Sequence, residues 1–161
     1  MISSNATVLT GKIGKNVTIS EYCVIRENVI IGNDVIIHPN VIINDGVIIS
    51  DGVEIFPGAL IGKQPQGSAS LKHKPEFTSR IEIGPKSSIG PNSIIYYDVM
   101  IGSDCLLGDA VAIRERCVIA DSCIIGRHVS LLYNVTVGRG TRIMTNSHIT
   151  GNSEIGENVV I

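Results

Sequence analysis

Aliphatic residues recur at every sixth position along this chain. The repeated residue is Ile at each step from Ile13 to Ile61, and the repeat resumes at Ile83 and runs to Ile161 as Ile, Leu or Val. A period of six matches neither the 3.6-residue repeat of a helix nor the two-residue alternation of a strand. Repetition at a fixed short period indicates a repeat array, so the chain is read as one repetitive unit.

The pattern of residues within each hexapeptide predicts one short strand followed by one corner. If the aliphatic position is called i, position i−2 usually carries a small side chain and faces the same side of the strand as i. Position i+1 is often Gly, and position i+3 is mostly Asn, Asp or Gly. These residue types tolerate left-handed backbone angles and mark turns. Only a closed coil of such strands buries every i and i−2 side chain in one core.

One segment interrupts the repeat. After Ile61 and Gly62 the six-residue spacing is lost until Ile83, and its phase slips, so residues 63–82 are expected to leave the coil. The segment is polar and contains prolines, and we expect none of its residues to fill a core slot. Long loops in compact domains are often functional, so we expect this one to contact a substrate or a neighbouring subunit. The alternative is an idle surface loop.

Composition narrows the class of protein. With 161 residues the chain is expected to form one domain, residues 1–161. The net charge of −2, with both signs mixed, argues against nucleic acid and anionic membrane surfaces as partners. No segment is apolar enough to span a membrane and the N-terminus lacks the features of a signal peptide, so we expect a cytoplasmic protein.

The cysteines all fall in one kind of position. They occupy i−2, a slot that selects a small inward side chain, and they are Cys23, Cys105, Cys117 and Cys123. This placement predicts buried structural thiols rather than a disulfide or a metal site, because unpaired cysteine is among the most buried residue types.

The outward position i−1 is apolar over most of the chain and then becomes polar. The apolar members include Val24, Ile30, Ile36, Ile42, Ile48, Ile94, Met100, Leu106, Ala112, Val118 and Ile124. Exposed apolar walls of this extent predict self-association. From residue 130 onward the same position holds Ser130, Thr136, Arg142, His148 and Glu154. This switch predicts a functional site in the last coils.

His148 is the histidine that a strand places on an outward position. His38 and His128 fall in corner slots, and His73 lies in the interrupting segment. Because rigid elements hold site geometry better than loops, His148 is the candidate catalytic residue, with a surface or interface histidine as the alternative. The candidate substrate-binding residues are Arg142, Asn146, Asn152, Glu154 and His73, and no metal ligands are expected.

The motif of Ile, Leu or Val followed by Gly and four further residues, as at residues 31–36, resembles the hexapeptide-repeat transferases. This resemblance implies an all-β fold, a left-handed parallel β-helix with three hexapeptides per triangular coil and about seven coils. It also implies a homotrimer, since trimers are what that family forms.

The string of residues 145–152, TNSHITGN, sharpens the resemblance. It is similar to the region that carries the reactive histidines of sugar acyltransferases, where the UDP-N-acetylglucosamine O-acyltransferases read His-Ile-x-His-Asp. Here the first histidine is His148, and Gly151 replaces the second, which is the general base of that group. The interrupting segment also looks similar to the loop of those enzymes, at Ile61-Gly62, Pro65-Gln66, Leu71-Lys72, Pro75 and Ile83-Gly84.

With residues 95–99 (IYYDV) and 113–115 (IRE), the chain is more similar to bacterial nucleotide-amino-sugar N-acetyltransferases. These use acetyl-CoA as co-substrate, need no metal, and make sugars for surface glycans. The substitution at Gly151 fits this reading, because an amine nucleophile needs less help from a base than a hydroxyl does.

Three alternatives remain open at this stage: an O-acyltransferase acting on a sugar nucleotide, a non-catalytic trimeric scaffold, and a γ-class carbonic anhydrase. The last needs three histidines on zinc, with two of them a few residues apart. The closest pair here, His128 and His148, is more than one coil apart. The chain stops at Ile161 on the repeat without a polar cap, and repeat arrays are usually capped, so we expect it to be the N-terminal part of a longer protein.

Overall fold

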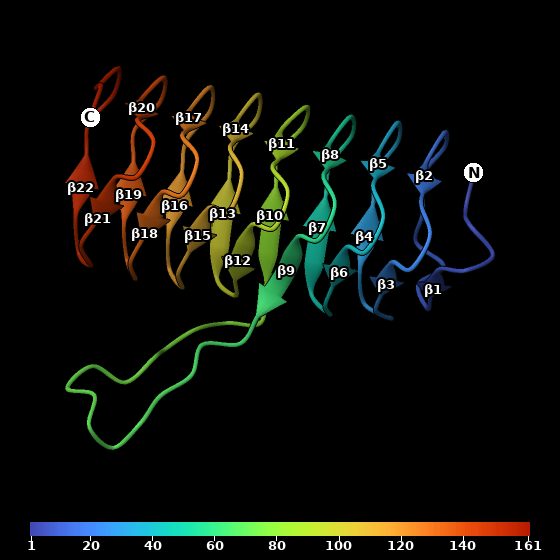
Figure 1. The fold of residues 1–161 in the computed structure, drawn as a ribbon, viewed down its shortest axis with the longest axis horizontal. Coiled ribbons are helices and arrows are strands. Elements are labelled where there is room, and N and C mark those ends of the chain that lie inside the picture. The colour runs from blue at the N-terminus through green and yellow to red at the C-terminus, as the bar shows by residue number, and fades with distance from the viewer.

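The computed structural model describes residues 1–161, and all of its regular structure consists of 22 short strands. The strands wind as a left-handed parallel β-helix whose coils stack along one axis, with the two termini at opposite ends (Figure 1). Each full coil gives one strand to each of three parallel sheets, which form the walls of a prism. The predicted fold class and its repeat are confirmed.

The three walls are named here by their strands. Wall 1 contains β1 (Thr7–Val8), β3 (Val24–Ile25), β6 (Ile42–Ile43), β9 (Leu60–Lys63), β12 (Ile94–Tyr96), β15 (Ala112–Ile113), β18 (Ser130–Leu131) and β21 (His148–Ile149). Wall 2 contains β2 (Thr18–Ile19), β5 (Ile36–Ile37), β8 (Glu54–Ile55), β11 (Ser88–Ile89), β14 (Leu106–Leu107), β17 (Ile124–Ile125) and β20 (Arg142–Ile143). Wall 3 contains β4 (Ile30–Ile31), β7 (Val47–Ile49), β10 (Ile81–Ile83), β13 (Val99–Ile101), β16 (Val118–Ile119), β19 (Thr136–Val137) and β22 (Glu154–Ile155).

The core is a single column of aliphatic side chains enclosed by the three walls. It comprises 36 buried residues, and side chains at the i positions such as Ile25, Ile55 and Ile95 have no exposed surface. Burial of one such side chain stabilises the fold by about 1.5–3 kcal/mol. The predicted inward direction of i and i−2 is therefore confirmed.

The corners explain the other two repeated positions. Every residue with a left-handed backbone angle other than Gly62 falls at i+3, as Asn16 (φ 55°) and Asn92 (φ 57°) do. The glycines at i+1 have a different cause, because apart from Gly62 none of them is left-handed. A Cβ on Gly84 would lie 2.5 Å from the carbonyl carbon of Gly102, so these glycines allow successive coils to approach closely.

The interrupting loop is shorter than the sequence predicts. Strand β9 continues to Lys63 and β10 begins at Ile81, so the excursion comprises residues 64–80, which project from the prism in Figure 1. Ile81 is completely buried, and the prediction that no residue of 63–82 fills a core slot is wrong for it. An irregularity in register, at the pairing of Tyr96 with Lys63, marks the strand from which the loop departs.

The four cysteines are buried and unpaired, as predicted. Their thiols donate hydrogen bonds to main-chain carbonyls, for example from Cys117 Sγ to Leu132 O at 3.0 Å and from Cys123 Sγ to Gly138 O at 3.1 Å. Burial raises the pKa of all four thiols and brings the pKa of Cys117 to about 12. These side chains are packing residues that also satisfy corner carbonyls.

Iodoacetamide at pH 8 should leave all four cysteines of the folded protein unmodified over a time in which the unfolded protein is fully labelled. The thiolate is the reactive form, and a raised pKa together with burial suppresses it. Mass spectrometry of the intact protein measures the outcome. Modification of Cys117 in the folded state would contradict this account of the core.

Replacement of residues 65–78 by a short Gly-Ser linker should preserve the β-sheet circular dichroism spectrum and lower the thermal midpoint by only a few degrees. The ladders of β9 and β10 remain intact in this variant, and the cost of closing a surface loop depends weakly on its length. A matched deletion that also removes Ile81 should destabilise the protein much more, because it empties a core slot. Loss of the β-sheet signal in the first variant would show that the loop is structural.

Candidate active site

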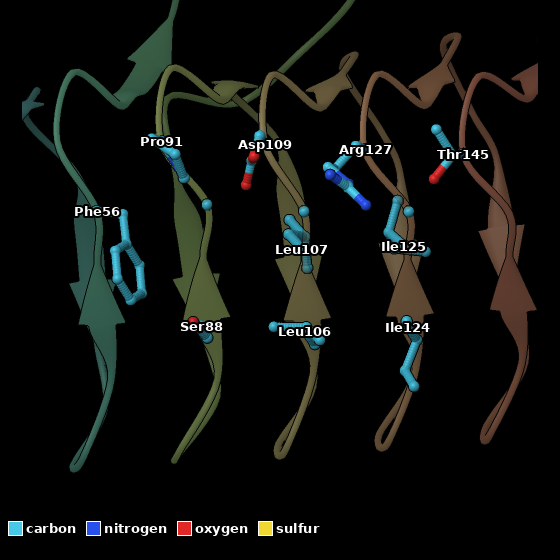
Figure 2. Close-up of a pocket in the computed structure, with 13 residues that line it drawn as sticks. Phe56, Ser88, Pro91, Leu106, Leu107, Asp109, Ile124, Ile125, Arg127 and Thr145 are labelled. Atoms are coloured by element: carbon cyan, nitrogen blue, oxygen red, sulfur yellow. The ribbon is translucent and has the colours of Figure 1, made fainter.

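A groove runs along the edge where wall 2 meets wall 1. Its volume is about 560 Å³, and successive coils each contribute residues to it (Figure 2). The groove is lined by Phe56, Ser88, Gly90, Pro91, Leu106, Leu107, Gly108, Asp109, Ile124, Ile125, Gly126, Arg127 and Thr145. Because the groove follows the prism axis, it fits an extended ligand better than a compact one.

The groove exists because side chains are missing from one corner position. Along this edge the i+1 residue of successive coils is Phe56, then Gly90, Gly108 and Gly126. No side chain can be added to the floor, since a Cβ on Gly126 would lie 2.6 Å from the backbone nitrogen of Thr145. This groove was not predicted from the sequence, although three glycines at intervals of one coil were its signal.

The N-terminal end of the groove is closed by an aromatic pair. The ring of Phe56 stacks on His38, with centroids 4.8 Å apart and an interplanar angle of 16°. His38 Nε2 lies 2.8 Å from Glu54 Oε1, and this contact holds the His38 ring in place beneath Phe56. His38 therefore supports the groove and does not merely fill a turn slot.

His148 lies on wall 1, in β21, and its side chain is exposed on the outer face. Its Nδ1 is 2.9 Å from the hydroxyl of Ser130, its direct partner on the preceding coil. In the tautomer whose Nδ1–H donates to Ser130, the lone pair of Nε2 is free to accept a proton. Only two residues, Asn146 and Ser147, separate His148 from Thr145 of the groove.

The structure separates the other residues of the predicted polar patch. Arg142 projects from wall 2 and Glu154 from wall 3, so the three side chains at i−1 in the last coil point in three directions. The cause is the three-fold winding, because residues six apart always lie on different walls. Within one chain Arg142 and Glu154 are therefore not neighbours of His148 on its own wall.

Asn146 and Asn152 occupy the two corners that flank β21. Both have left-handed backbone angles, with φ of 66° and 60°. Asn152 Oδ1 also accepts a hydrogen bond from Asn134 Nδ2 at 2.8 Å. Corner geometry thus accounts for the choice of asparagine at both positions, and their side chains lie one on each side of the His148 strand.

The edge between wall 1 and wall 3 carries charged and aromatic side chains. The carboxylate of Glu115 is completely buried and receives two hydrogen bonds from Arg114, at 2.8 and 3.2 Å. The Arg114 guanidinium also lies 4.9 Å from the centroid of the Tyr96 ring. Bidentate pairing of this kind offsets part of the cost of burying the Glu115 carboxylate, and it holds the Arg114 guanidinium in one orientation.

The loop residue His73 packs against this same edge. Its ring stacks on Tyr133, with centroids 3.9 Å apart and an interplanar angle of 11°. Tyr133 did not emerge from the sequence, because its corner slot shows no fixed residue type. The structure therefore brings His73 to the coil that precedes His148 in the same chain.

Metal-binding clusters and membrane-spanning helices are both absent from the chain. No three His, Cys, Asp or Glu side chains gather in an arrangement that could hold a metal ion. The structure also has no helix with the length and apolar character needed to cross a membrane.

Two family models match the sequence. The model of the GMPPB C-terminal domain matches residues 77–161, which is more than half of the chain. The model described as bacterial transferase hexapeptide (six repeats) matches residues 10–45. No curated protein matches the sequence significantly.

Several solved structures share the fold. A UDP-N-acetylglucosamine acyltransferase from Bacteroides fragilis aligns with a TM-score of 0.83 at 28% identity, over 99% of this chain and 70% of that one. Another UDP-N-acetylglucosamine acyltransferase has a TM-score of 0.71 at 26% identity, over 96% of this chain and 67% of that one.

The enzyme of the same description from Francisella novicida shares the fold at a TM-score of 0.70 and 24% identity, over 92% of this chain. The chain spans only 62% of the length of that protein. The six-residue repeat agrees with the transferase hexapeptide model, and the triangular coils agree with the solved structures. The chain belongs to the family of the GMPPB C-terminal domain, whose model covers residues 77–161, and it shares the hexapeptide-repeat fold of the solved acyltransferase structures.

Proposed function

We propose that this chain is part of a cytoplasmic acyltransferase that moves an acetyl group from acetyl-CoA to the amine of a nucleotide-linked amino sugar. The observation that carries the proposal is the pair of His148 and Ser130, held on a rigid wall a few residues from a long groove. The family supports group transfer, and the aligned structures are described as acting on UDP-N-acetylglucosamine.

The groove is the candidate site for the acyl donor. The arm of coenzyme A is long and narrow and has both apolar and polar segments. The groove offers Leu106 and Ile124 on one side and Asp109 and Arg127 on the other, along several coils. Arg127 supplies a positive charge of the kind that binds phosphate groups.

The reaction then requires one proton acceptor. The neutral amine attacks the thioester carbonyl carbon, a C–N bond forms, and the C–S bond breaks. The proton lost by the amine passes to His148 Nε2 and leaves with the CoA thiol. Because imidazole changes charge near neutral pH, it can both accept and return this proton.

The residue at position 151 favours an amine over a hydroxyl acceptor. Gly151 stands where the similar O-acyltransferases have their second histidine, and an amine does not need that base. The competing function is O-acylation of a sugar nucleotide, which the likeness to the acyltransferase structures favours. Assays with acetyl-CoA and matched nucleotide sugars, one with a free amine and one with a hydroxyl, distinguish the two.

Replacement of His148 by alanine should lower kcat by about 10²–10⁴-fold with little change in thermal midpoint, as expected for loss of a general base on an exposed strand position. His128→Asn is the matched control, because His128 is an exposed left-handed corner residue and Asn tolerates that geometry. Steady-state kinetics measure both variants. An unchanged rate for His148→Ala would remove His148 from the site.

The protein should sediment as a trimer at micromolar concentration. Apolar side chains are exposed on all three walls, such as Ile42 on wall 1, Leu106 on wall 2 and Met100 on wall 3, and patches of this kind mark interfaces. Replacement of an exposed apolar residue by Glu on the wall that packs against the neighbouring chain should dissociate the trimer. The same replacement on a wall outside the interface should not. A monomer for the unmodified protein would contradict the prediction.

A further inference from the structure

The loop of residues 64–80 projects from the prism and contacts the edge of its own chain through the rings of Phe77 and His73. It joins the prism between β9 and β10 and extends toward the C-terminal coils in Figure 1. Near its base the ring of Phe77 stacks on Tyr97, with centroids 6.2 Å apart and an interplanar angle of 5°. Further along, His73 stacks on Tyr133 at 3.9 Å. Tyr97 and Tyr133 occupy the same corner position two coils apart, so the loop follows the prism axis.

The ring of Tyr133 also explains why residue 151 is glycine. Gly151 is not left-handed, so its backbone does not require glycine. A Cβ at this position would lie 2.7 Å from Cζ and 2.8 Å from Cε2 of Tyr133. Tyr133 is therefore the middle of three layers, with His73 of the loop on one face and Gly151 of the coil that carries His148 on the other.

His73 lies in a small cavity, and one of the residues that line it is held by an ion pair. Leu71, Pro75, Arg114 and Leu132 line a small cavity with His73 and Tyr133. Arg114 is held in place by the buried Glu115. His73 Nε2 has no exposed surface and no hydrogen-bond partner, so the stack on Tyr133 is what orients the ring.

Docking of the loop holds two lysines next to His73, which contacts Tyr133 on the coil before that of His148. Lys72 and Lys74 flank His73 and are exposed, whereas His73 is partly buried against the edge. A nucleotide-linked sugar carries a diphosphate, which lysine side chains can bind. If the loop were released, these two charges would no longer be held near the coil that precedes that of His148.

We infer that Tyr133 is a positioning residue that pins the 64–80 loop across the edge beside His148 of the same chain, so that each chain closes the acceptor side of its own site. This inference rests on the proposed function for its substrate, a nucleotide-linked sugar. The docking itself rests only on the stack of His73, Tyr133 and Gly151.

Limited trypsin digestion tests the docking without any assay of activity. Tyr133→Ala should speed cleavage of the bond after Lys72 by about three- to tenfold, because loss of an aromatic pair raises the population of the open loop. His73→Ala, which changes only the loop, should have the same effect. Tyr133→Phe should restore the natural rate because it keeps the ring. Tyr22→Ala, at an exposed tyrosine near the other end of the prism, is the matched control.

Kinetics then test the positioning role. Tyr133→Ala should raise KM for the nucleotide sugar by about tenfold, while kcat and KM for acetyl-CoA change little, and Tyr133→Phe should restore KM. An unchanged KM for the sugar would overturn the positioning role. Equal cleavage after Lys72 in Tyr133→Ala and the natural chain would overturn the docking. Absence of acetyl transfer by the natural protein would refute the proposed function instead, and the digestion would still decide whether the loop is pinned.

Discussion

The hydrogen-bond ladder between successive coils is the constraint on which the rest of the structure depends. Each strand pairs in parallel with the strand one coil away, as in the bond from Gly108 N to Ile125 O at 2.8 Å and that from Ser130 N to Ser147 O at 3.1 Å. A residue therefore lies directly over the residue one coil before it. Interactions such as those of His148 with Ser130 and Phe56 with His38 follow from this stacking.

Much of the fold could be predicted from single positions, because the core places the same requirement on every hexapeptide. The side chains at i and i−2 must be apolar or small and must face inward, so Ile95 and Cys117 are identified by spacing alone. The left-handed corner at i+3 is equally visible, since Asn and Gly tolerate it best. Ile81 stands at i−2 of Ile83 and could have been counted from it, but the whole of residues 63–82 was assigned to the loop.

The candidate site was only partly predictable, because it depends on which positions lie in the same column. His148 could be found from one outward slot, whereas its pairing with Ser130 depends on the 18-residue coil, which the family resemblance implies but the six-residue repeat alone does not. Arg142 and Glu154 share with His148 the outward polar position of the last hexapeptides, but the winding turns each onto another wall. The groove and the contact of Tyr133 with Gly151 arise from missing side chains, which become visible only when coils are superposed.

The way in which the two ends of the 64–80 loop are attached to the prism has a consequence for protein engineering. Lys63 O accepts a hydrogen bond from Tyr97 N at 3.0 Å, and Arg80 O accepts one from Asp98 N at 2.8 Å. Both ends are thus fixed to the next coil at adjacent residues, independently of what lies between them. A folded segment whose own termini lie close together could be grafted at this junction, and the prism would display it at a defined height along its axis.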